Sequence, residues 1–286
     1  MQKSQIKEKL KSAIQIYKKT KDPRASEVIE HLTKILSTSK SRDSLLNYAK
    51  HVYPGYKDPA HIKLIAKNLE LLEKGEINRL AVFMPPRHGK SMLCSEFFPA
   101  WYLGNNPNEF VIQSTYAQEL ADDFGRKVRN QIASPDFNSV FPQVGLRADS
   151  SSAKRFHTMQ GGTYSAVGAG GAITGRGAHL LIIDDPIKGR EDAESETQRR
   201  NLVEWYKSVA YTRLQPGGKV IIIQTRWHQD DLAGHILAES KEDWKVLDLP
   251  AIDTKGNALW PEAYSKEDLG KIKDTVGQRV WQALYQ

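Results

Sequence analysis

Cysteine is almost absent from the sequence, and long apolar runs are missing altogether. The 286 residues include one cysteine, Cys94, which excludes a disulfide within the chain and fits a reducing compartment. No uninterrupted apolar run approaches the length of a membrane-spanning helix, about 18 residues. The first residues lead into a charged amphipathic stretch and not into the apolar core of a signal peptide. We therefore expect a soluble intracellular protein without a membrane segment.

The composition is that of an ordinary globular protein with an excess of positive charge. Hydrophobic residues make up 40% of the chain and charged residues 26%. A net charge of +7 and a pI of about 9.2 favour an anionic partner such as nucleic acid or a nucleotide. A solvated basic surface explains the same charge equally well. The length allows one large domain, or one domain with appendages, and we find no internal repeat.

The chain divides into a helical extension, a mixed α/β region and a short final segment. We expect residues 1–57 to form the extension, because Ile6, Leu10, Ile14 and Tyr17 recur at helical spacing. Residues 58–265 are expected to form the main domain, starting with an amphipathic helix over 58–74. Residues 266–286 are expected to begin a linker. Short apolar runs, interpreted as strands, lie at 80–84, 110–114, 179–183, 220–224 and 246–249.

Helical patterns fill the gaps between these runs, at 91–102, 118–132, 196–214 and 230–240. Near-continuous apolar strands separated by helices predict a mostly parallel sheet covered on both faces. The stretch 161–177 contains seven glycines, and we expect it to be a mobile loop with a short hairpin-like strand at 163–167.

The octet MPPRHGKS at 84–91 follows the first apolar run directly and has the layout of a phosphate-binding P-loop. Successive backbone N–H groups would wrap the phosphates, and the following helix would point its positive N-terminus at them. Lys90 would reach the phosphates and the Ser91 hydroxyl would bind Mg²⁺. The general pattern has glycine where Met84 stands, so a strand–helix turn with a chance Gly-Lys-Ser is the alternative. The residues expected to bind the nucleotide here are Pro86, Arg87, His88, Gly89, Lys90, Ser91 and Met92.

The third apolar run includes LLII at 180–183 and is followed by Asp184 and Asp185. A buried strand ending in two carboxylates is the second half of a P-loop NTPase site. Asp184 would hold Mg²⁺ opposite Ser91, and Asp185 would orient the attacking water. The alternative is that the two aspartates and Pro186 only end a strand and begin a turn.

A third strand end and two arginines complete the predicted site. Gln224 and Thr225 follow the run at 220–223, where ligands bind in open α/β sheets, so either could sense the terminal phosphate. The alternative for Thr225 is a helix N-cap. Phosphoryl transfer needs an arginine, which Arg87 could supply within the chain and Arg176 to a neighbouring subunit. A surface salt bridge is the alternative for both arginines.

Three other features have simpler interpretations. His228, Asp231 and His235 share a helical face, which allows a zinc site but fits a hydrogen-bonded face better. His88 is expected to shape the loop through a hydrogen bond and not to act as a general base. Cys94 is expected to be a small core residue.

The ordered set of motifs resembles the ATPase domain of the large terminase subunit of tailed bacteriophages. The resemblance rests on PPRHGKS at 85–91, LIIDDP at 181–186 and TRWH at 225–228. Further matches are STY at 114–116, RLQPGG at 213–218, LPA at 249–251 and LWPE at 259–262. The likeness extends from about residue 58 to the last residue.

The resemblance implies an α/β fold of the P-loop NTPase class (ASCE type), with ATP and Mg²⁺ as ligands. It implies roles for Arg87, Lys90 and Ser91 in phosphate binding, for Asp184 in metal binding, and for Gln224 and Thr225 in coupling. The family more commonly has Glu where Asp185 stands. The resemblance also implies an adenine pocket before the first strand, for which Pro59 and His61 are candidates.

The family resemblance further implies double-stranded DNA, a portal protein and a small terminase subunit as partners, and a homo-oligomeric ring in the host cytoplasm. Such proteins usually carry a nuclease domain, which we expect to be missing here because the chain stops where the linker into it begins. Two alternatives stay open: a helicase-like nucleic-acid-dependent ATPase, and a non-hydrolysing basic DNA-binding module. Strand-separation assays and nucleotide titrations would distinguish them.

Overall fold

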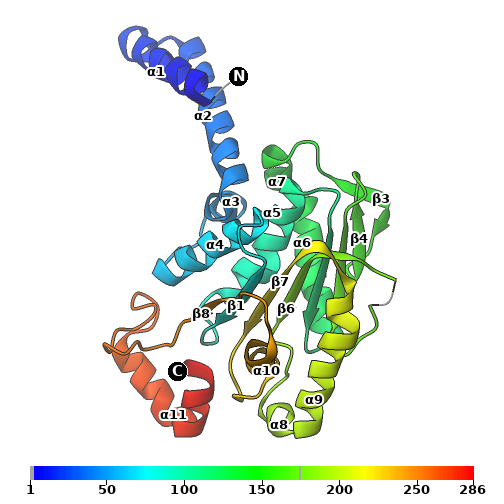
Figure 1. Cartoon of the computed structure of the whole chain (residues 1–286). Helices are drawn as coiled ribbons and strands as arrows, with labels where there is room; N and C mark the ends of the chain where they lie inside the picture. Colours follow the sequence, from blue (N-terminus) through cyan, green and yellow to red (C-terminus); the bar gives the residue numbers. More distant parts are fainter. Residues whose placement is uncertain (1–2, 174) are drawn as a thin grey trace.

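The computed structural model describes residues 3–173 and 175–286, which form a central eight-stranded sheet with helices on both faces (Figure 1). The strand order is β3-β4-β5-β2-β6-β7-β1-β8. All pairings from β5 to β8 are parallel, whereas β3–β4 and β4–β5 are antiparallel. The strands are β1 (Arg79–Phe83), β2 (Phe110–Thr115), β3 (Leu146–Ser151), β4 (Arg155–Thr158), β5 (Thr163–Gly168), β6 (Ala178–Asp184), β7 (Leu214–Gln224) and β8 (Lys245–Asp248).

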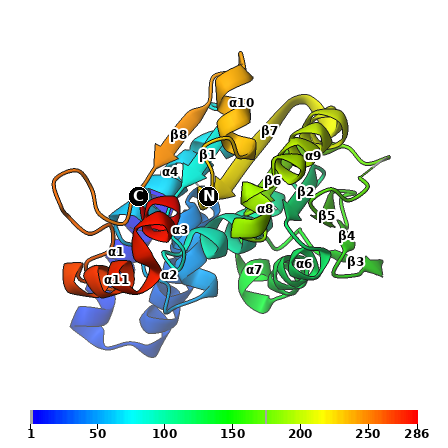
Figure 2. The ribbon, with the colours of Figure 1, turned by 90° about the horizontal axis from the view of Figure 1, so that it is seen from below.

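Alternate side chains of each central strand enter two different hydrophobic cores, as the period of two in a strand requires. In β1, Leu80 and Val82 join the core beneath α4 to α6, whereas Ala81 and Phe83 join the core beneath α9 and α10. Figure 2 shows these two groups of helices on opposite faces of the sheet. The predicted mostly parallel sheet flanked by helices is therefore confirmed. The helices are α1 (Lys3–Thr20), α2 (Pro23–Asp43), α3 (Leu45–Val52), α4 (Ala60–Glu73), α5 (Phe98–Asn105), α6 (Gln118–Ile132), α7 (Pro135–Val140), α8 (Arg190–Glu194), α9 (Glu196–Trp205), α10 (Leu232–Glu239) and α11 (Lys266–Tyr285).

β7 lies between β1, which leads into the phosphate loop, and β6, which ends in the two aspartates. This inserted strand is the arrangement expected of the ASCE type of P-loop fold. It places the ends of β1, β7 and β6 side by side at the carboxyl edge of the sheet, where open α/β sheets bind ligands.

The glycine-rich stretch contains the short hairpin-like strand expected at 163–167, but the structure holds this part in the sheet and not in a mobile loop. Residues Thr163–Gly168 form β5, which is buried along its whole length and pairs in parallel with β2. Two of the glycines serve close packing: a Cβ at Gly162 would lie 2.4 Å from the Pro107 carbonyl oxygen, and one at Gly168 would lie 2.9 Å from the Gln118 backbone nitrogen. The sequence did not predict β3 or β4, and β7 begins at Leu214, where a helix was expected to end.

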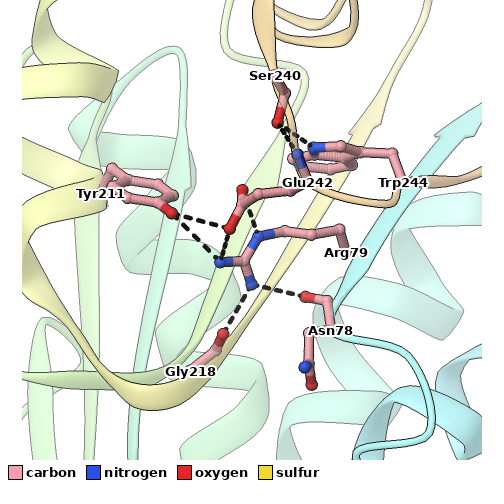
Figure 3. A network of polar contacts seen from close by, with 7 residues as sticks. All are labelled: Asn78, Arg79, Tyr211, Gly218, Ser240, Glu242 and Trp244. Atoms are coloured by element: carbon pink, nitrogen blue, oxygen red, sulfur yellow. Dashed lines mark hydrogen bonds and ion pairs between the residues drawn. The ribbon is translucent and has the colours of Figure 1, made fainter.

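A polar network holds the opposite, amino-terminal edge of the sheet (Figure 3). The buried Arg79 guanidinium donates to both carboxylate oxygens of Glu242, at 2.8 Å from Nε and 2.5 Å from Nη2. It also donates to the Gly218 carbonyl oxygen at 2.7 Å. Tyr211 donates its hydroxyl to Glu242 at 2.8 Å. The network fixes the start of β1 against the irregular first half of β7.

The terminal segments pack against the main domain more closely than the expected boundaries at residues 57 and 266 imply. The division into domains stays a prediction. Leu45, Tyr48 and Ala49 of α3 are fully buried in the main core, although we assigned α3 to the extension. α1 and α2 form a hairpin that stands away from the sheet in Figure 1. The final segment forms α11, which buries Leu269 and Trp281 against Ala251. No helix of the described residues has the length and apolar character needed to cross a membrane.

Candidate nucleotide-binding site

The phosphate loop at 84–91 connects β1 to the helical turn that begins at Lys90. Arg87 and Gly89 adopt positive φ angles of 63° and 92°, which turn the backbone tightly around the loop. Gly89 has both a conformational and a steric reason to be glycine, since a Cβ there would lie 3.2 Å from Ile62 Cδ1 of α4. Met84, which replaces the first glycine of the general pattern, is buried in the main core. The loop therefore keeps its shape without that glycine.

His88 holds the loop through its ring and its carbonyl group. The ring donates from Nδ1 to the Pro86 carbonyl oxygen at 2.8 Å and stacks on Tyr264, with 4.7 Å between ring centroids. The His88 carbonyl oxygen accepts a hydrogen bond from His61 Nε2 at 3.0 Å. Trp260 packs against His61, with ring centroids 5.6 Å apart. We call His61, His88, Trp260 and Tyr264 the aromatic bracket; it joins the loop to α4 and to the segment before α11.

Burial lowers the pKa of both His61 and His88, so both rings are neutral at pH 7. The predicted loop-shaping role of His88 agrees with these contacts. His61, an adenine-pocket candidate, is buried beneath the loop, and Pro59 precedes the first residue of α4.

Lys90 and Asp185 are joined by an ion pair of 2.7 Å between Nζ and Oδ2. The Lys90 side chain is 7% exposed and that of Asp185 31%, so the pair lies at the mouth of the site. The two halves of the predicted site, more than 90 residues apart in sequence, are therefore in direct contact.

Asp185 occupies a constrained position at the end of β6. Its φ angle is 42°, a conformation that L-residues seldom adopt. The Asp185 N–H donates to the Ile223 carbonyl oxygen at 2.8 Å. Its Oδ1 accepts hydrogen bonds from the Thr225 N–H at 2.8 Å and from the Thr225 hydroxyl at 3.3 Å. The carboxylate is thus held between the phosphate loop and the end of β7.

Asp184 points into the protein beneath the loop and is 1% exposed. Its Oδ2 accepts a 2.6 Å hydrogen bond from Ser95 Oγ, and the Ser91 side chain is near enough to oppose the rise in the pKa of the carboxyl group that burial causes. Burial and the neighbouring Asp185 raise the pKa of Asp184 to about 6, against the opposing effect of Lys90. Asp184 Oδ1 is buried without a hydrogen-bond partner.

This arrangement fits a divalent cation. A buried carboxylate oxygen without a partner is costly, and a hard cation that takes oxygen ligands would compensate it. Asp184 and Ser91 are the two residues predicted to hold Mg²⁺, and the fold brings them together. The donor set of one carboxylate and one hydroxyl matches the way Mg²⁺ keeps several waters in nucleotide sites.

Ser95 is a site residue that we did not predict. It lies four residues after Ser91, so both project from the same side of the helix. Residues Met92–Phe97 form a wide π-helical turn just before Pro99. Since Pro99 has no N–H, the Ser95 carbonyl oxygen is free to accept from Gln113 Nε2 at 3.1 Å. The spacing of two serines four residues apart was the sequence signal for this contact.

The residues after β7 form a second polar cluster next to the site. Gln224 is 3% exposed and is near enough to the Asp231 carboxyl group to oppose the rise in its pKa that burial causes. Asp231 caps α10 by accepting from the Gly234 N–H at 2.8 Å and pairs with Arg226 Nε at 2.6 Å. The N-cap of α10 is therefore Asp231 and not Thr225.

The zinc alternative receives no support from these contacts. Asp231 is already satisfied, and His235 pairs with Glu239 at 2.9 Å. Within residues 3–173 and 175–286, no cluster of three or more His, Cys, Asp or Glu side chains could hold a metal ion.

The two candidate arginines lie in different places. Arg87 is exposed on the loop itself. Arg176 precedes β6, which runs from Ala178 to Asp184 and ends at the site. At about 3.3 Å per residue, Arg176 is roughly 20 Å or more from the aspartates, at the opposite edge of the sheet. Burial and the charge of Arg155 lower the pKa of Arg176. Of the two, only Arg87 lies next to the site of its own chain.

Comparison with known proteins identifies the family. Residues 82–282 match the family described as "Terminase large subunit, T4likevirus-type, N-terminal". No protein with a curated description matches the chain in sequence.

Two solved structures share the fold at low identity. One is an arginine-to-alanine mutant of the large terminase ATPase domain of Thermus phage P74-26. It is 13% identical in sequence, and the alignment has a TM-score of 0.54 and covers 83% of this chain and 96% of that one. The other is the large terminase of bacteriophage HK97: 13% identity, TM-score 0.52, 77% of this chain and 49% of that one. The aligned region thus spans about half the length of the HK97 protein. The match over residues 82–282 covers most of the chain, which therefore belongs to the large terminase subunit family.

Proposed function

We propose that this chain is the ATPase motor of a viral large terminase, which hydrolyses ATP to drive double-stranded DNA into a procapsid. The observation that carries the proposal is the meeting of Lys90 and Ser91 of the loop with Asp184 and Asp185 of β6. Positive charge, a metal-binding oxygen pair and a second carboxylate at one strand edge are the parts that phosphoryl transfer requires. ATP hydrolysis is the expected activity of this set of residues.

Phosphate binding is expected to break the Lys90–Asp185 ion pair. The phosphates of ATP offer the Lys90 ammonium more negative charge than one carboxylate does. Once released, Asp185 keeps its hydrogen bond from the Thr225 N–H and stays at the end of β6. Its free Oδ2 then becomes the acceptor that orients a water molecule and takes its proton.

Asp184 and Ser91 would hold Mg²⁺. When bound, the ion neutralises negative charge on the phosphates in the transition state. Asp184 is kept in place by the Ser95 hydroxyl, so the metal-binding oxygen Oδ1 has a fixed direction.

Coupling to movement is proposed to pass through Thr225. Its N–H and hydroxyl both donate to Asp185 Oδ1. A displacement of that carboxylate on hydrolysis would therefore shift the residues at the end of β7. Gln224 connects the same strand end to the cap of α10 through Asp231. We propose that these two residues transmit the loss of the terminal phosphate.

The proposed partners follow from the family. They are double-stranded DNA, a portal protein and a small terminase subunit, with a ring of identical subunits as the working state in the host cytoplasm. The exposed Arg87 or the Arg176 of a neighbour would supply the arginine of the site.

The decisive experiment measures ATP turnover of the purified chain with and without double-stranded DNA. Turnover that requires Mg²⁺ and rises with DNA supports the motor. Nucleotide binding without turnover would favour a non-hydrolysing DNA-binding module. Separation of DNA strands during turnover would favour a helicase-like enzyme instead.

A further inference from the structure

The positive charge of the chain is concentrated at one end. The first 24 residues contain eight Lys or Arg and two Asp or Glu, so they carry six of the seven net positive charges. The structure places this segment in α1 and the start of α2. The remaining residues, including the whole sheet, are almost neutral overall. An anionic partner is therefore expected to contact the α1–α2 hairpin.

Three of these lysines share one face of α1. Lys7, Lys11 and Lys18 are spaced four and seven residues apart, which brings them within about 40° of one another around the helix. Along the axis they lie about 6 Å and 10 Å apart. All three side chains are exposed, whereas Ile6 and Ala13 of the same helix are buried against α2. We call Lys7, Lys11 and Lys18 the basic stripe.

The basic stripe has no acidic partner among the residues that the structure describes. No ion pair involves any of its three lysines. Lys18 at the end of α1 is favoured by the helix dipole. Lys7 and Lys11 lack this stabilisation by the helix dipole. Like charges four residues apart on a helix also repel each other. An external anion would remove this repulsion.

The hairpin is firmly attached although it stands away from the sheet (Figure 1). At the end of α2, Arg42 donates from Nη2 to the Val140 carbonyl oxygen at 2.6 Å. Trp101 of α5 donates from Nε1 to the Ser41 carbonyl oxygen at 3.1 Å. Force applied to α1 would therefore reach the helix that follows the phosphate loop.

We propose that the basic stripe binds the phosphate backbone of duplex DNA without regard to sequence. The choice of DNA rests on the proposed function. Duplex DNA presents one negative charge per about 1.7 Å of its axis, which suits a row of flexible lysines. Binding of single strands relies on exposed aromatic rings, and the one aromatic residue of α1, Tyr17, is covered by the Lys21 ammonium at 5.4 Å.

A protein partner would use another side of the helix. Ile16 is 51% exposed and Val28 of α2 is 47% exposed. Ile16 lies about 160° from Lys18 around α1, so the apolar positions and the basic stripe do not form one surface. The stripe itself is purely cationic, which fits a backbone of phosphates better than a mixed protein interface.

The test is the binding of a fluorescently labelled 30-bp duplex to the full chain, followed by anisotropy at several salt concentrations. One variant carries Lys7→Gln, Lys11→Gln and Lys18→Gln. A matched variant carries Lys241→Gln, Lys255→Gln and Lys266→Gln, which removes the same charge from exposed sites elsewhere. The stripe variant should bind at least about tenfold more weakly at 0.1 M salt, with a salt slope less steep by about 2 to 3. The matched variant should stay within about twofold of the parent.

Three results would overturn the proposal: unchanged binding by the stripe variant, equal losses in both variants, or polyglutamate displacing the duplex at the same concentration of charge. ATP turnover without DNA is measured on the same proteins, which separates the two ideas. Stripe-dependent duplex binding by a chain that hydrolyses no ATP would refute only the proposed motor. Normal turnover with stripe-independent binding would refute only the role of the stripe.

Discussion

Lys90 and Asp185 form a 2.7 Å ion pair across the candidate site, which links the phosphate loop to the end of β6. The ammonium that would bind phosphate is thus paired with the carboxylate that would orient the water molecule. The pair keeps both charges satisfied while no phosphate is present. On the proposed mechanism, Asp185 would become available as a base only after Lys90 has bound another anion.

Replacing Lys90 by alanine should abolish ATP turnover and leave the fold intact. The ammonium stabilises charge that develops on the phosphates, and loss of one such group costs about 10²–10³ in rate. Steady-state turnover and circular dichroism measure the two effects. Turnover within a few-fold of the parent would show that the loop is not a P-loop.

Asp185→Asn and Asp184→Asn should have different effects. The first should lose hydrolysis but still bind Mg·ATP, because the amide oxygen can keep the hydrogen bond from the Thr225 N–H while the base is lost. The second should weaken Mg²⁺ binding, because the unpartnered Oδ1 belongs to the proposed metal site. Calorimetric titration with and without Mg²⁺ separates binding from turnover. Normal hydrolysis by Asp185→Asn would mean that another carboxylate positions the water.

The isolated chain should be a slow, largely monomeric ATPase that is stimulated when subunits assemble on DNA. Arg176 lies at the opposite edge of the sheet from Asp184, so it can act only in a neighbouring subunit. An arginine supplied in this way is worth about 10³–10⁵ in rate. Turnover measured against protein concentration, with DNA present, should therefore rise steeply.

Mixing experiments test Arg176 directly. Arg176→Ala chains and Lys90→Ala chains, each inactive alone, should regain some turnover when mixed, since one supplies an intact pocket and the other the arginine. Arg87→Ala is the control, because an arginine acting within its own chain gives no rescue with Lys90→Ala. If the dilute monomer already matches the assembled motor, Arg87 is sufficient.

Acidification should destabilise the protein through His61 and His88. Burial lowers the pKa of both below the ordinary value of 6.5. Between that value and the lower folded pKa the unfolded chain binds more protons than the folded one, so the free energy of unfolding falls as the pH falls. Thermal unfolding should show a melting temperature that decreases from pH 7 toward pH 5. The doubly substituted His61→Phe, His88→Phe protein should show a weaker decrease; an unchanged pH profile would contradict this origin.

Tyr264→Ala should weaken ATP binding, whereas Tyr264→Phe should not. The ring of Tyr264 stacks on His88 with an angle of 20° between the planes, and phenylalanine keeps this contact. Loss of the ring leaves the loop to sample conformations that do not bind phosphate, which raises the Kd for ATP by about fivefold if one stacking contact of about 1 kcal/mol is lost. Equal affinities of the two variants would show that the stacking does not position the loop.

The sequence predicted those parts of the fold that local patterns encode. β1 and β6 contain near-continuous apolar runs of a sheet buried on both faces, and the predicted Ser91, Asp184 and Asp185 lie at or beyond the carboxyl ends of these two strands. β3 and β4 were missed because they are short, polar and partly exposed strands at one end of the sheet, with β3 at its edge. β5 was expected only as a short hairpin-like strand within a mobile loop, because the sequence does not show that the glycines flanking it serve close packing and not flexibility.

Contacts between distant segments could not be predicted in this way. Nothing near His88 in sequence indicates that Tyr264 stacks on it, and nothing near Asp185 shows that Lys90 neutralises it. α3 was assigned to an extension because a short helical pattern does not reveal what it packs against. Pairwise contacts of this kind depend on the closed fold, whereas strands and loops depend on local spacing.

The aromatic bracket couples the phosphate loop to α11. Tyr264 is followed at once by Ser265, which caps α11 together with Asp268. Any nucleotide that changes the shape of the phosphate loop must therefore do work on the position of this helix. By thermodynamic reciprocity, a load that shifts α11 must change the affinity for that nucleotide by the same factor. A force applied to α11 would then change the fraction of sites that hold a nucleotide.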